Sequence, residues 1–230
     1  MTHNGRPVRL SIVVPALNEA AGIASVLQSL APLRARGHEV IVVDGGSSDP
    51  TPTLAAPWAD RVLNSAPGRA LQMNAGAAVA QGTLLLFLHA DTRLPADAES
   101  ALQRAIEAGA CWGRFDVHIE GRSLWLPVIA ALMNGRSRLT GIATGDQALF
   151  VQRALFMQLG GYAKLPLMED IELCRRLRAH SRPACLRERV QTSGRRWDSR
   201  GVWRTVWLMW RLRWRYWRGE SADSLARAYR

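Results

Sequence analysis

Residues 39–49 read EVIVVDGGSSD. Four consecutive β-branched apolar residues are typical of a strand buried on both faces, and the aspartate, glycines and serines after them are typical of a tight loop. Two other segments repeat the arrangement, LSIVVPALNE at 10–19 and TLLLFLHADT at 83–92. Segments with helical spacing separate these strands. The sequence therefore predicts an α/β fold with a mostly parallel central sheet that is flanked by helices on both faces.

The same patterns predict the remaining elements. The expected strands are Leu10–Val14, Glu39–Val43, Arg61–Leu63, Thr83–His89, Gly113–Ile119 and Ala148–Val151. The expected helices are Ala20–Leu33, Thr51–Ala56, Gly68–Ala80, Pro95–Ala108, Leu124–Arg138 with a break at Pro127, Arg153–Leu159 and Glu169–Ala179.

Composition narrows the class of protein. The chain has 230 residues, of which 48% are hydrophobic and 21% charged, which indicates a globular protein with a core of its own. Three widely spaced cysteines (Cys111, Cys174 and Cys185) form neither a disulfide framework nor a zinc-ligand pattern, so we expect a reducing, cytoplasmic location. No apolar run is long enough to span a bilayer, and the first residues lead straight into a strand, so we expect no signal peptide.

Polar side chains follow the three buried strands. In parallel sheets, ligands bind at the carboxyl ends of the strands, and this edge would collect Glu19, Asp44, His89 and Asp91. Asp91 can hold a divalent cation that neutralises a diphosphate, or it can cap the helix that follows. Asp44 can accept hydrogen bonds from a base or ribose, or it can serve the turn in which it lies.

Acids further along the chain offer a second set of candidates. Glu169 and Asp170 begin a predicted helix, where the helix dipole favours acids, and either one can act as a general base on a hydroxyl. Asp146 and Gln147 follow a small loop, and they can face a ligand or form a buried polar pair.

Seven sequence blocks, in order, resemble the family 2 glycosyltransferases, which have the nucleotide-sugar-binding GT-A fold. The blocks are PALNE (15–19), VVDGGSSDPT (42–51), GRALQMNAGA (68–77), LHADTRLP (88–95), TGDQALF (144–150), GGY (160–162) and MEDIELCRRLR (168–178), and SGRRW (193–197) follows them. The similarity is closest to a short, soluble bacterial branch associated with arsenosugar biosynthesis. It implies an inverting, metal-assisted transfer of a sugar from a nucleotide-diphospho-sugar to an acceptor hydroxyl.

The resemblance also implies roles for individual residues. Asp170 would be the catalytic base, with Glu169 beside it, and Asp91 would bind the diphosphate and a Mg²⁺ or Mn²⁺ ion. The residues implied in nucleotide-sugar binding are Pro15, Ala16, Glu19, Asp44, Arg69, Asp91, Asp146, Gln147, Arg195, Arg196 and Trp197.

One position departs from the family pattern. Where the family has Asp-x-Asp, this chain has His89-Ala90-Asp91. A neutral histidine can ligate a transition metal, so His89 joins Asp91 as a candidate metal ligand, or it can donate a hydrogen bond to a ribose or phosphate.

The last 49 residues carry most of the charge. They hold 13 arginines against 4 acids, a net charge of +9 out of +11 for the whole chain. Trp203, Trp207, Trp210, Trp214 and Trp217 recur at helical spacing and form one stripe. The opposite face is also apolar, so one face would pack on the domain while the other meets a homodimer partner or a membrane surface. Tryptophans locked in such a stripe are poorly placed to stack on bases, so we expect no nucleic-acid binding.

These observations divide the chain into two parts. Residues 1–200 would form the glycosyltransferase domain, with a nucleotide-binding half at about 8–110 and an acceptor half at about 111–200, and residues 201–230 a basic, Trp-rich amphipathic helical extension. The acceptor is an unidentified hydroxyl compound, and family acceptors are often lipid-linked, which would place the protein on the inner face of the membrane. The alternative functions are nucleotidyl transfer and a non-catalytic, membrane-associated nucleotide-sugar-binding role.

Overall fold

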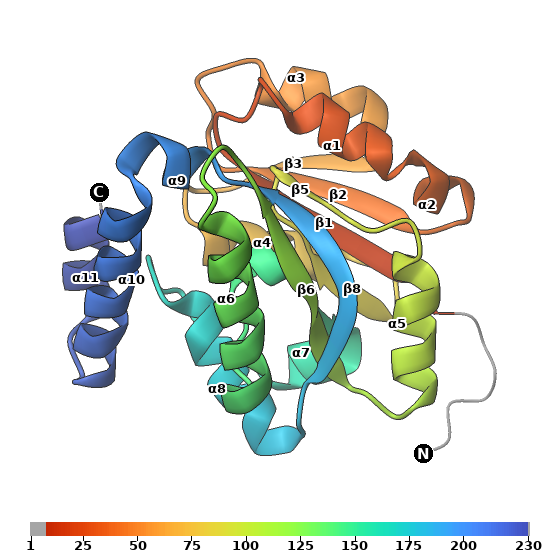
Figure 1. Cartoon of the computed structure of the whole chain (residues 1–230). Helices are drawn as coiled ribbons and strands as arrows, with labels where there is room; N and C mark the ends of the chain where they lie inside the picture. Colours follow the sequence, from red (N-terminus) through yellow and green to blue (C-terminus); the bar gives the residue numbers. More distant parts are fainter. Residues whose placement is uncertain (1–7, 230) are drawn as a thin grey trace.

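The computed structural model describes residues 8–229, which build a curled sheet of eight strands with helices packed on both faces (Figure 1). The strand order is β3-β2-β1-β4-β7-β6-β8-β5. The strands are β1 (Leu10–Ala16), β2 (Glu39–Asp44), β3 (Arg61–Asn64), β4 (Leu84–Phe87), β5 (Thr92–Arg93), β6 (Trp112–Glu120), β7 (Leu149–Gln152) and β8 (Ala184–Ser193).

The sheet has a parallel half and a mixed half. β1 lies between β2 and β4 and is parallel to both, and β3 continues the parallel part beyond β2. β7 is antiparallel to β4 and β6, β8 is parallel to β6, and β5 is antiparallel to β8 at the edge. The predicted α/β fold is therefore confirmed, and its parallel character resides chiefly in the first half of the chain.

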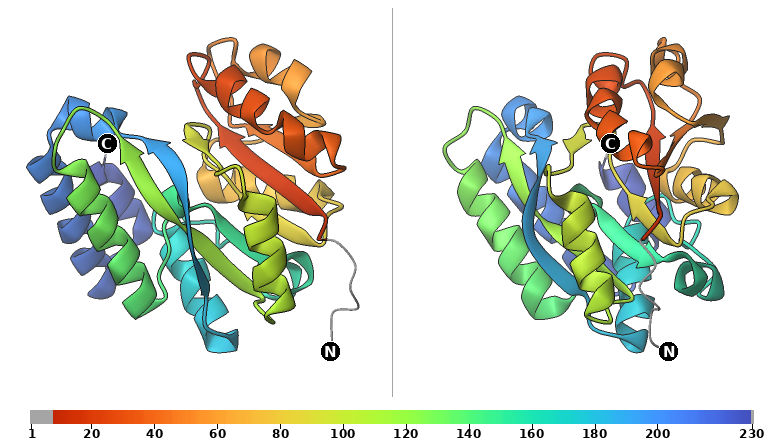
Figure 2. Two further views of the ribbon diagram at one scale, coloured as in Figure 1. Left: turned by 45° about the vertical axis from the view of Figure 1, so that its right-hand side comes forward. Right: turned by 90° about the vertical axis from the view of Figure 1, so that its right-hand side faces the viewer.

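Two hydrophobic clusters show which helices cover which face. Alternate residues of β1 point to opposite sides, so Ile12 belongs to one cluster and Val13 to the other. The first face is covered by α1 (Ile23–Ser29), α2 (Ala31–Ala35), α3 (Thr51–Ala55), α5 (Ala98–Glu107) and α6 (Leu126–Thr140). The second face is covered by α4 (Arg69–Val79), α7 (Arg153–Gln158) and α8 (Glu169–His180), and Figure 2 shows both layers.

One glycine sets the distance between a helix and the sheet. A Cβ atom on Gly76 would lie 2.4 Å from Cγ1 of Val13. Only glycine allows α4 to approach β1 this closely, and the approach brings the first turn of α4 to the carboxyl edge of the sheet.

Three sequence expectations about elements are corrected. The expected helix at 20–33 is two helices, because Pro32 has no N–H to continue the hydrogen-bonding of α1. Pro127 does not break a helix, because it lies in the first turn of α6, where no intrahelical bond is lost. The expectation missed β8, whose arginines and glutamate interrupt the apolar pattern.

The C-terminal helices pack beside the domain, next to α6 (Figure 1). They are α9 (Arg195–Arg200), α10 (Val202–Trp217) and α11 (Ala222–Tyr229). The amphipathic helix expected at 203–217 is present as α10, with Leu212 fully buried and the five tryptophans exposed. The boundary between the domain and this extension stays a prediction.

Candidate active site

Two loops at the carboxyl edge of the parallel strands are held together by hydrogen bonds. The backbone N–H of Asn18, after β1, donates to Ser47 Oγ at 2.8 Å, and the N–H of Ser48, after β2, donates to Asn18 Oδ1 at 2.8 Å. Gln72 of α4 donates its side-chain amide to the carbonyls of Ala16 and Val43 at 2.7 and 2.9 Å. The two strand ends are therefore fixed to each other and to α4.

The predicted nucleoside-binding residues lie within this frame. Pro15 and Ala16 are buried at the end of β1, in register with Val43 and Asp44. The Asp44 carboxylate accepts hydrogen bonds from the N–H groups of Gly46 and Ser47 and from the Ser47 hydroxyl. Asp44 thus fulfils the turn role that its sequence context allows, and its loop forms the floor of the edge where a nucleoside would lie.

Arg195 joins two predicted binding acids that lie far away in the sequence. Its Nη2 atom lies 2.8 Å from Oε2 of Glu19 and 3.5 Å from Oδ2 of Asp91. The hydrogen bond to Glu19 raises the pKa of Arg195. The loops after β1 and β4 therefore meet the first residue of α9 at one point, and Arg195 presents a fixed positive charge there.

The histidine that departs from the family pattern has a defined partner. Nδ1 of His89 lies 3.3 Å from Oδ1 of Asp146, and the His89 side chain is nearly buried. Partial burial opposes ionisation of Asp146, but the hydrogen bond from His89 and the charges of His89, Arg69 and Arg196 outweigh it, so the pKa of Asp146 lies below its usual range. His89 therefore connects the end of β4 to the loop before β7.

A close backbone approach fixes the other side of the His89 ring. A Cβ atom on Gly145 would lie 2.1 Å from Nε2 of His89 and 3.2 Å from Oδ2 of Asp170. The Gly145 N–H donates to that same Asp170 oxygen at 2.8 Å. The loop at 144–147 therefore brings His89, Asp146 and Asp170 into one group.

The proposed base and its neighbour form a buried acidic pair. Glu169 and Asp170 are 4% and 9% exposed, in the first turn of α8, after Met168 with a left-handed φ of 70°. Burial and the Asp170 charge raise the pKa of Glu169 to about 7. Burial also raises the pKa of Asp170, although the charges of His89 and Arg69 oppose the rise. A pair of this kind holds a proton near neutral pH, which suits a general acid–base role.

Some of the other predicted site residues lie close to the acidic pair, and others pack behind the loops that form the site. Arg69 begins α4 at the surface, and its charge acts on the acidic pair and on Asp146. Gln147 is fully buried and donates to Asn134 Oδ1 at 3.3 Å, so it supports the loop from behind. Trp197 packs against the first hydrophobic cluster, and the Arg196 guanidinium lies 4.8 Å from the centre of the Tyr229 ring.

The described part of the chain offers the Asp91 carboxylate as a candidate anchor for a divalent cation. Within residues 8–229, no group of three or more His, Cys, Asp or Glu side chains is arranged to hold a metal ion. Asp91 still offers a partly exposed carboxylate whose only ion pair is the 3.5 Å contact with Arg195 among the described residues. Asp91 stays the candidate anchor, and a cation held there would need further oxygen ligands from outside the chain. A metal-ligand role for His89 stays a prediction.

The sequence did not single out several residues that shape this site. Gln72 and Gly145 lie inside two of the quoted blocks, yet only the folded chain shows that one joins the strand ends and the other contacts His89. Tyr162 is buried near the acidic pair, and burial together with the Asp170 charge raises its pKa. Its GGY context was visible, but no spacing argument predicts its position beside Asp170.

Comparisons with known proteins identify relatives of this chain. A sequence profile described as glycosyl transferase family 2 matches residues 11–159. A PGL/p-HBAD biosynthesis glycosyltransferase of Mycobacterium bovis is 38% identical over 91 residues, which are 36% of this chain and 36% of that protein. The matched segment thus spans about a third of the length of that relative.

Solved structures show the same fold at low identity. Glucosyl-3-phosphoglycerate synthase from Mycobacterium tuberculosis, in complex with Mg²⁺ and UDP, has a TM-score of 0.60 at 24% identity and covers 80% of this chain and 70% of its own. Mannosyltransferase PcManGT from Pyrobaculum calidifontis, in complex with GDP-Man and Mn²⁺, has a TM-score of 0.65 at 22% identity and covers 91% and 61%. Because the family profile covers well over half of the sequence, this chain belongs to the family 2 glycosyltransferases and has their GT-A fold.

Proposed function

We propose that this glycosyltransferase moves a sugar from a nucleotide-diphospho-sugar to an acceptor hydroxyl with inversion at the anomeric carbon. The observation that carries the proposal is the buried Glu169–Asp170 pair, in which Asp170 accepts a hydrogen bond from the Gly145 N–H next to His89, after the end of β4. A base of raised pKa in this place can take a proton from an acceptor while the donor lies along the strand ends.

The chemistry is a single displacement. The acceptor oxygen attacks the anomeric carbon, its proton passes to the Asp170 carboxylate, and the bond from that carbon to the diphosphate oxygen breaks. Glu169 beside Asp170 raises the basicity of the pair. Arg69 and Arg195 supply positive charge close to the leaving diphosphate, which stabilises the charge that develops there.

A divalent cation would add to this stabilisation. Asp91 would hold the ion, which neutralises the diphosphate as it leaves. Structural relatives of this chain are complexes with Mg²⁺ or Mn²⁺ and a nucleotide, which supports both the cation and the class of donor.

The two alternative functions receive less support. Membership of a glycosyltransferase family and the presence of the acidic pair favour sugar transfer over nucleotidyl transfer and over a non-catalytic binding role. The narrower association with arsenosugar biosynthesis and the cytoplasmic location stay predictions, and the three free cysteines agree with a reducing compartment.

A thermal-shift panel tests the proposed donor class. UDP, GDP, CDP, dTDP and their sugars are each added with Mg²⁺, Mn²⁺ or EDTA. A ligand at 100 times its dissociation constant adds roughly 2.7 kcal/mol to the free energy of unfolding, which such a panel resolves. We expect a metal-dependent shift with one base. A folded sample that responds to no nucleotide would refute the proposal.

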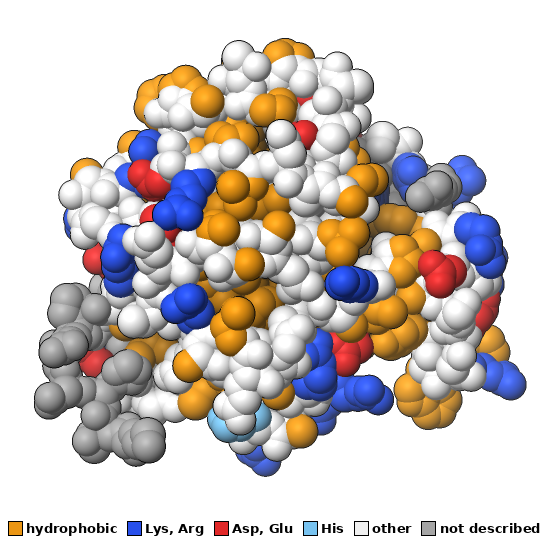
Figure 3. Space-filling view, turned by 180° about the vertical axis from the view of Figure 1, so that it is seen from behind, with side chains coloured by type: hydrophobic (Ala, Val, Ile, Leu, Met, Phe, Trp, Pro, Cys, Tyr) orange, Lys and Arg blue, Asp and Glu red, His pale blue; other side chains and the backbone are white. Residues whose placement is uncertain are grey.

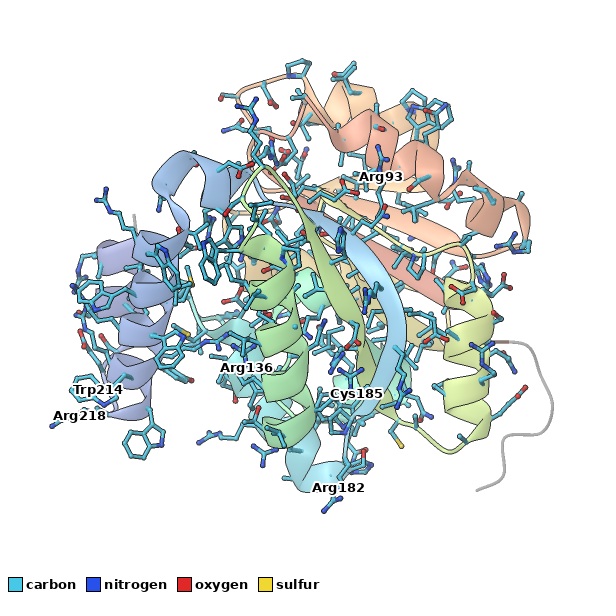
Figure 4. The ribbon with its side chains drawn as sticks, viewed as in Figure 1. Arg93, Arg136, Arg182, Cys185, Trp214 and Arg218 are labelled. Carbon is cyan, nitrogen blue, oxygen red and sulfur yellow. The ribbon has the colours of Figure 1, made fainter. Side chains whose placement is uncertain are left out.

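We also propose that the exposed tryptophan face of α10 docks on an anionic membrane surface. The tryptophans Trp203, Trp207, Trp210, Trp214 and Trp217 are 55–83% exposed along α10. At one end of this face, the ring centre of Trp125, beside the start of α6, lies 5.1 Å from that of Trp203, and Val128, Leu132 and Leu139 are also exposed on α6. Figure 4 shows Trp214 on the outer side of α10, away from α6.

The distribution of charge favours a membrane over a second copy of the chain. Arg211 and Arg218 lie 5.0 and 4.8 Å from the ring centres of Trp207 and Trp214, so cations alternate with aromatic rings on this face. The region also holds most of the net charge. A homodimer would bring these like charges together, whereas anionic headgroups would neutralise them. None of the helices in residues 8–229 has the length and apolarity to cross a bilayer.

Vesicle co-sedimentation tests this docking. We expect binding to vesicles of phosphatidylcholine with phosphatidylglycerol, weaker binding to phosphatidylcholine alone, and a loss of binding in high salt. Trp207→Ser with Trp214→Ser should lower the bound fraction, whereas Leu54→Ser, at an exposed apolar site on α3, should not. Equal vesicle binding by both variants would contradict the proposal. So would a wild-type dimer that becomes a monomer only in the tryptophan variant, with lipid binding unchanged.

A further inference from the structure

A cavity of about 690 Å³ opens between α6, α8 and α10. Four of its lining residues are arginines: Arg136, Arg175, Arg178 and Arg213. None of Arg136, Arg175 and Arg178 forms an ion pair with another residue in the range 8–229. Figure 3 shows the back of the molecule, where blue side chains gather at the lower margin of the domain beside the C-terminal helices. We refer to this space as the arginine cavity.

The two acids of the arginine cavity do not neutralise these arginines. Glu172 is bound by Arg176, whose Nε donates to Oε1 at 2.8 Å. Glu220 is bound by Arg215, whose Nε donates to Oε2 at 2.5 Å, and by the Ser224 hydroxyl. Neither Arg176 nor Arg215 lines the cavity. Arginines outside the cavity lining therefore neutralise both carboxylates, and the cavity keeps a net positive charge.

Arg136 is the clearest case of a buried guanidinium group that lacks hydrogen-bond acceptors. Its Nε and Nη2 atoms are buried and have no hydrogen-bond partner. Burial lowers the pKa of Arg136, because nothing nearby compensates fully for the loss of water. Figure 4 places Arg136 on α6, on the side that faces α10. An anion in the cavity would supply the missing acceptors.

The arginine cavity adjoins the catalytic pair. Ile171 and Glu172, the next two residues of α8 after Asp170, line it. Arg175 follows Asp170 by five residues, which is about 8 Å along a helix. The cavity therefore begins one residue beyond Asp170 on the same helix, although Asp170 itself is 9% exposed and does not line it.

We propose that the arginine cavity binds the phosphate group of the acceptor, which is then a hydroxyl compound that carries a phosphomonoester. The proposal rests on the proposed function, because it assigns the second substrate of that reaction. Several planar guanidinium groups match the oxygens of a phosphate dianion. Trp217 lines the cavity and also ends the exposed tryptophan stripe, so the phosphate can belong to a lipid headgroup or to a soluble compound.

Phosphorus NMR titrations test the proposal without any transfer reaction. Glycerol 3-phosphate is titrated with the full chain in EDTA, so that a metal–diphosphate site does not contribute. We expect line broadening by the wild type and at least tenfold weaker binding by Arg136→Gln and, separately, by Arg178→Gln. Arg61→Gln, at an exposed arginine of β3 on the far edge of the sheet, should bind like the wild type. The nucleotide-dependent thermal shift of Arg136→Gln should equal that of the wild type, which also shows that this variant is folded.

The source of the phosphate is read from a second probe. Tighter binding of monomeric dihexanoyl phosphatidic acid than of glycerol 3-phosphate supports a lipid-linked acceptor, and equal binding supports a soluble one. Absence of binding to both probes, or an equal loss in Arg61→Gln, overturns the proposal. If the protein binds phosphate but no nucleotide, the cavity remains an anion site and only the proposed function is refuted.

Discussion

The acidic pair should make the protein less stable as the pH rises, and Glu169→Gln should remove the part of that effect that comes from Glu169. The pKa of Glu169 is raised from 4.5 to about 7 in the folded chain. The folded state therefore binds more protons than the unfolded state between these two values, so the free energy of unfolding falls as the pH rises through that window. At 1.36 kcal/mol per pH unit, the loss is about 3 kcal/mol.

Urea denaturation at a series of pH values measures this effect. Glu169→Gln should be more stable than the wild type by about 3 kcal/mol at pH 8 and by far less at pH 4.5. Glu107→Gln, at an exposed position of α5, is the matched control and should follow the wild type at every pH. A difference between Glu169→Gln and the wild type that does not vary with pH would refute the reasoning, as would a variant that is less stable at pH 8.

Other substitutions probe the same site. Gly145→Ala adds a methyl group 2.1 Å from His89 Nε2, so we expect a loss of about 1–3 kcal/mol in unfolding free energy and a lower turnover number; an unaltered rate would show that the position of His89 does not matter. Asp91→Ala should weaken donor binding in the presence of metal and leave it unchanged in EDTA, as measured by calorimetry. If the variant binds the donor as tightly as the wild type both with metal and in EDTA, Asp91 does not hold the cation. Arg195→Gln should raise the donor dissociation constant about tenfold at low salt and less at high salt, because it removes a charge beside Asp91.

The strands and their loops could be predicted because their signals are local. EVIVV and LSIVV each carry an unbroken apolar run that ends at a polar loop, and a parallel arrangement then places Glu19, Asp44 and Asp91 at one edge. Strand β8 could not be predicted, because three charged residues in succession (187–189) interrupt its apolar pattern and its partner β6 lies about 70 residues earlier.

The acidic residues of the site could be predicted from the sequence, but the residues that contact them could not. Asp170 stood out as one of two acids at a helix start, but its contact with Gly145 depends on how the loop at 144–147 folds over β4. The bond between Arg195 and Glu19 joins residues 176 positions apart, which no local pattern reveals. The arginine cavity likewise needs α6, α8 and α10 together, although each of its arginines is visible in the sequence.

The most direct measurement compares donor hydrolysis and donor binding in the wild type and in Asp170→Asn. Hydrolysis needs no knowledge of the acceptor, because water takes its place. The account predicts that the wild type hydrolyses one nucleotide-diphospho-sugar slowly, and that Asp170→Asn shows the same thermal shift with that donor but loses hydrolysis at least a hundredfold. Hydrolysis by Asp170→Asn at the wild-type rate, with binding unchanged, would contradict the assignment of Asp170 as the base.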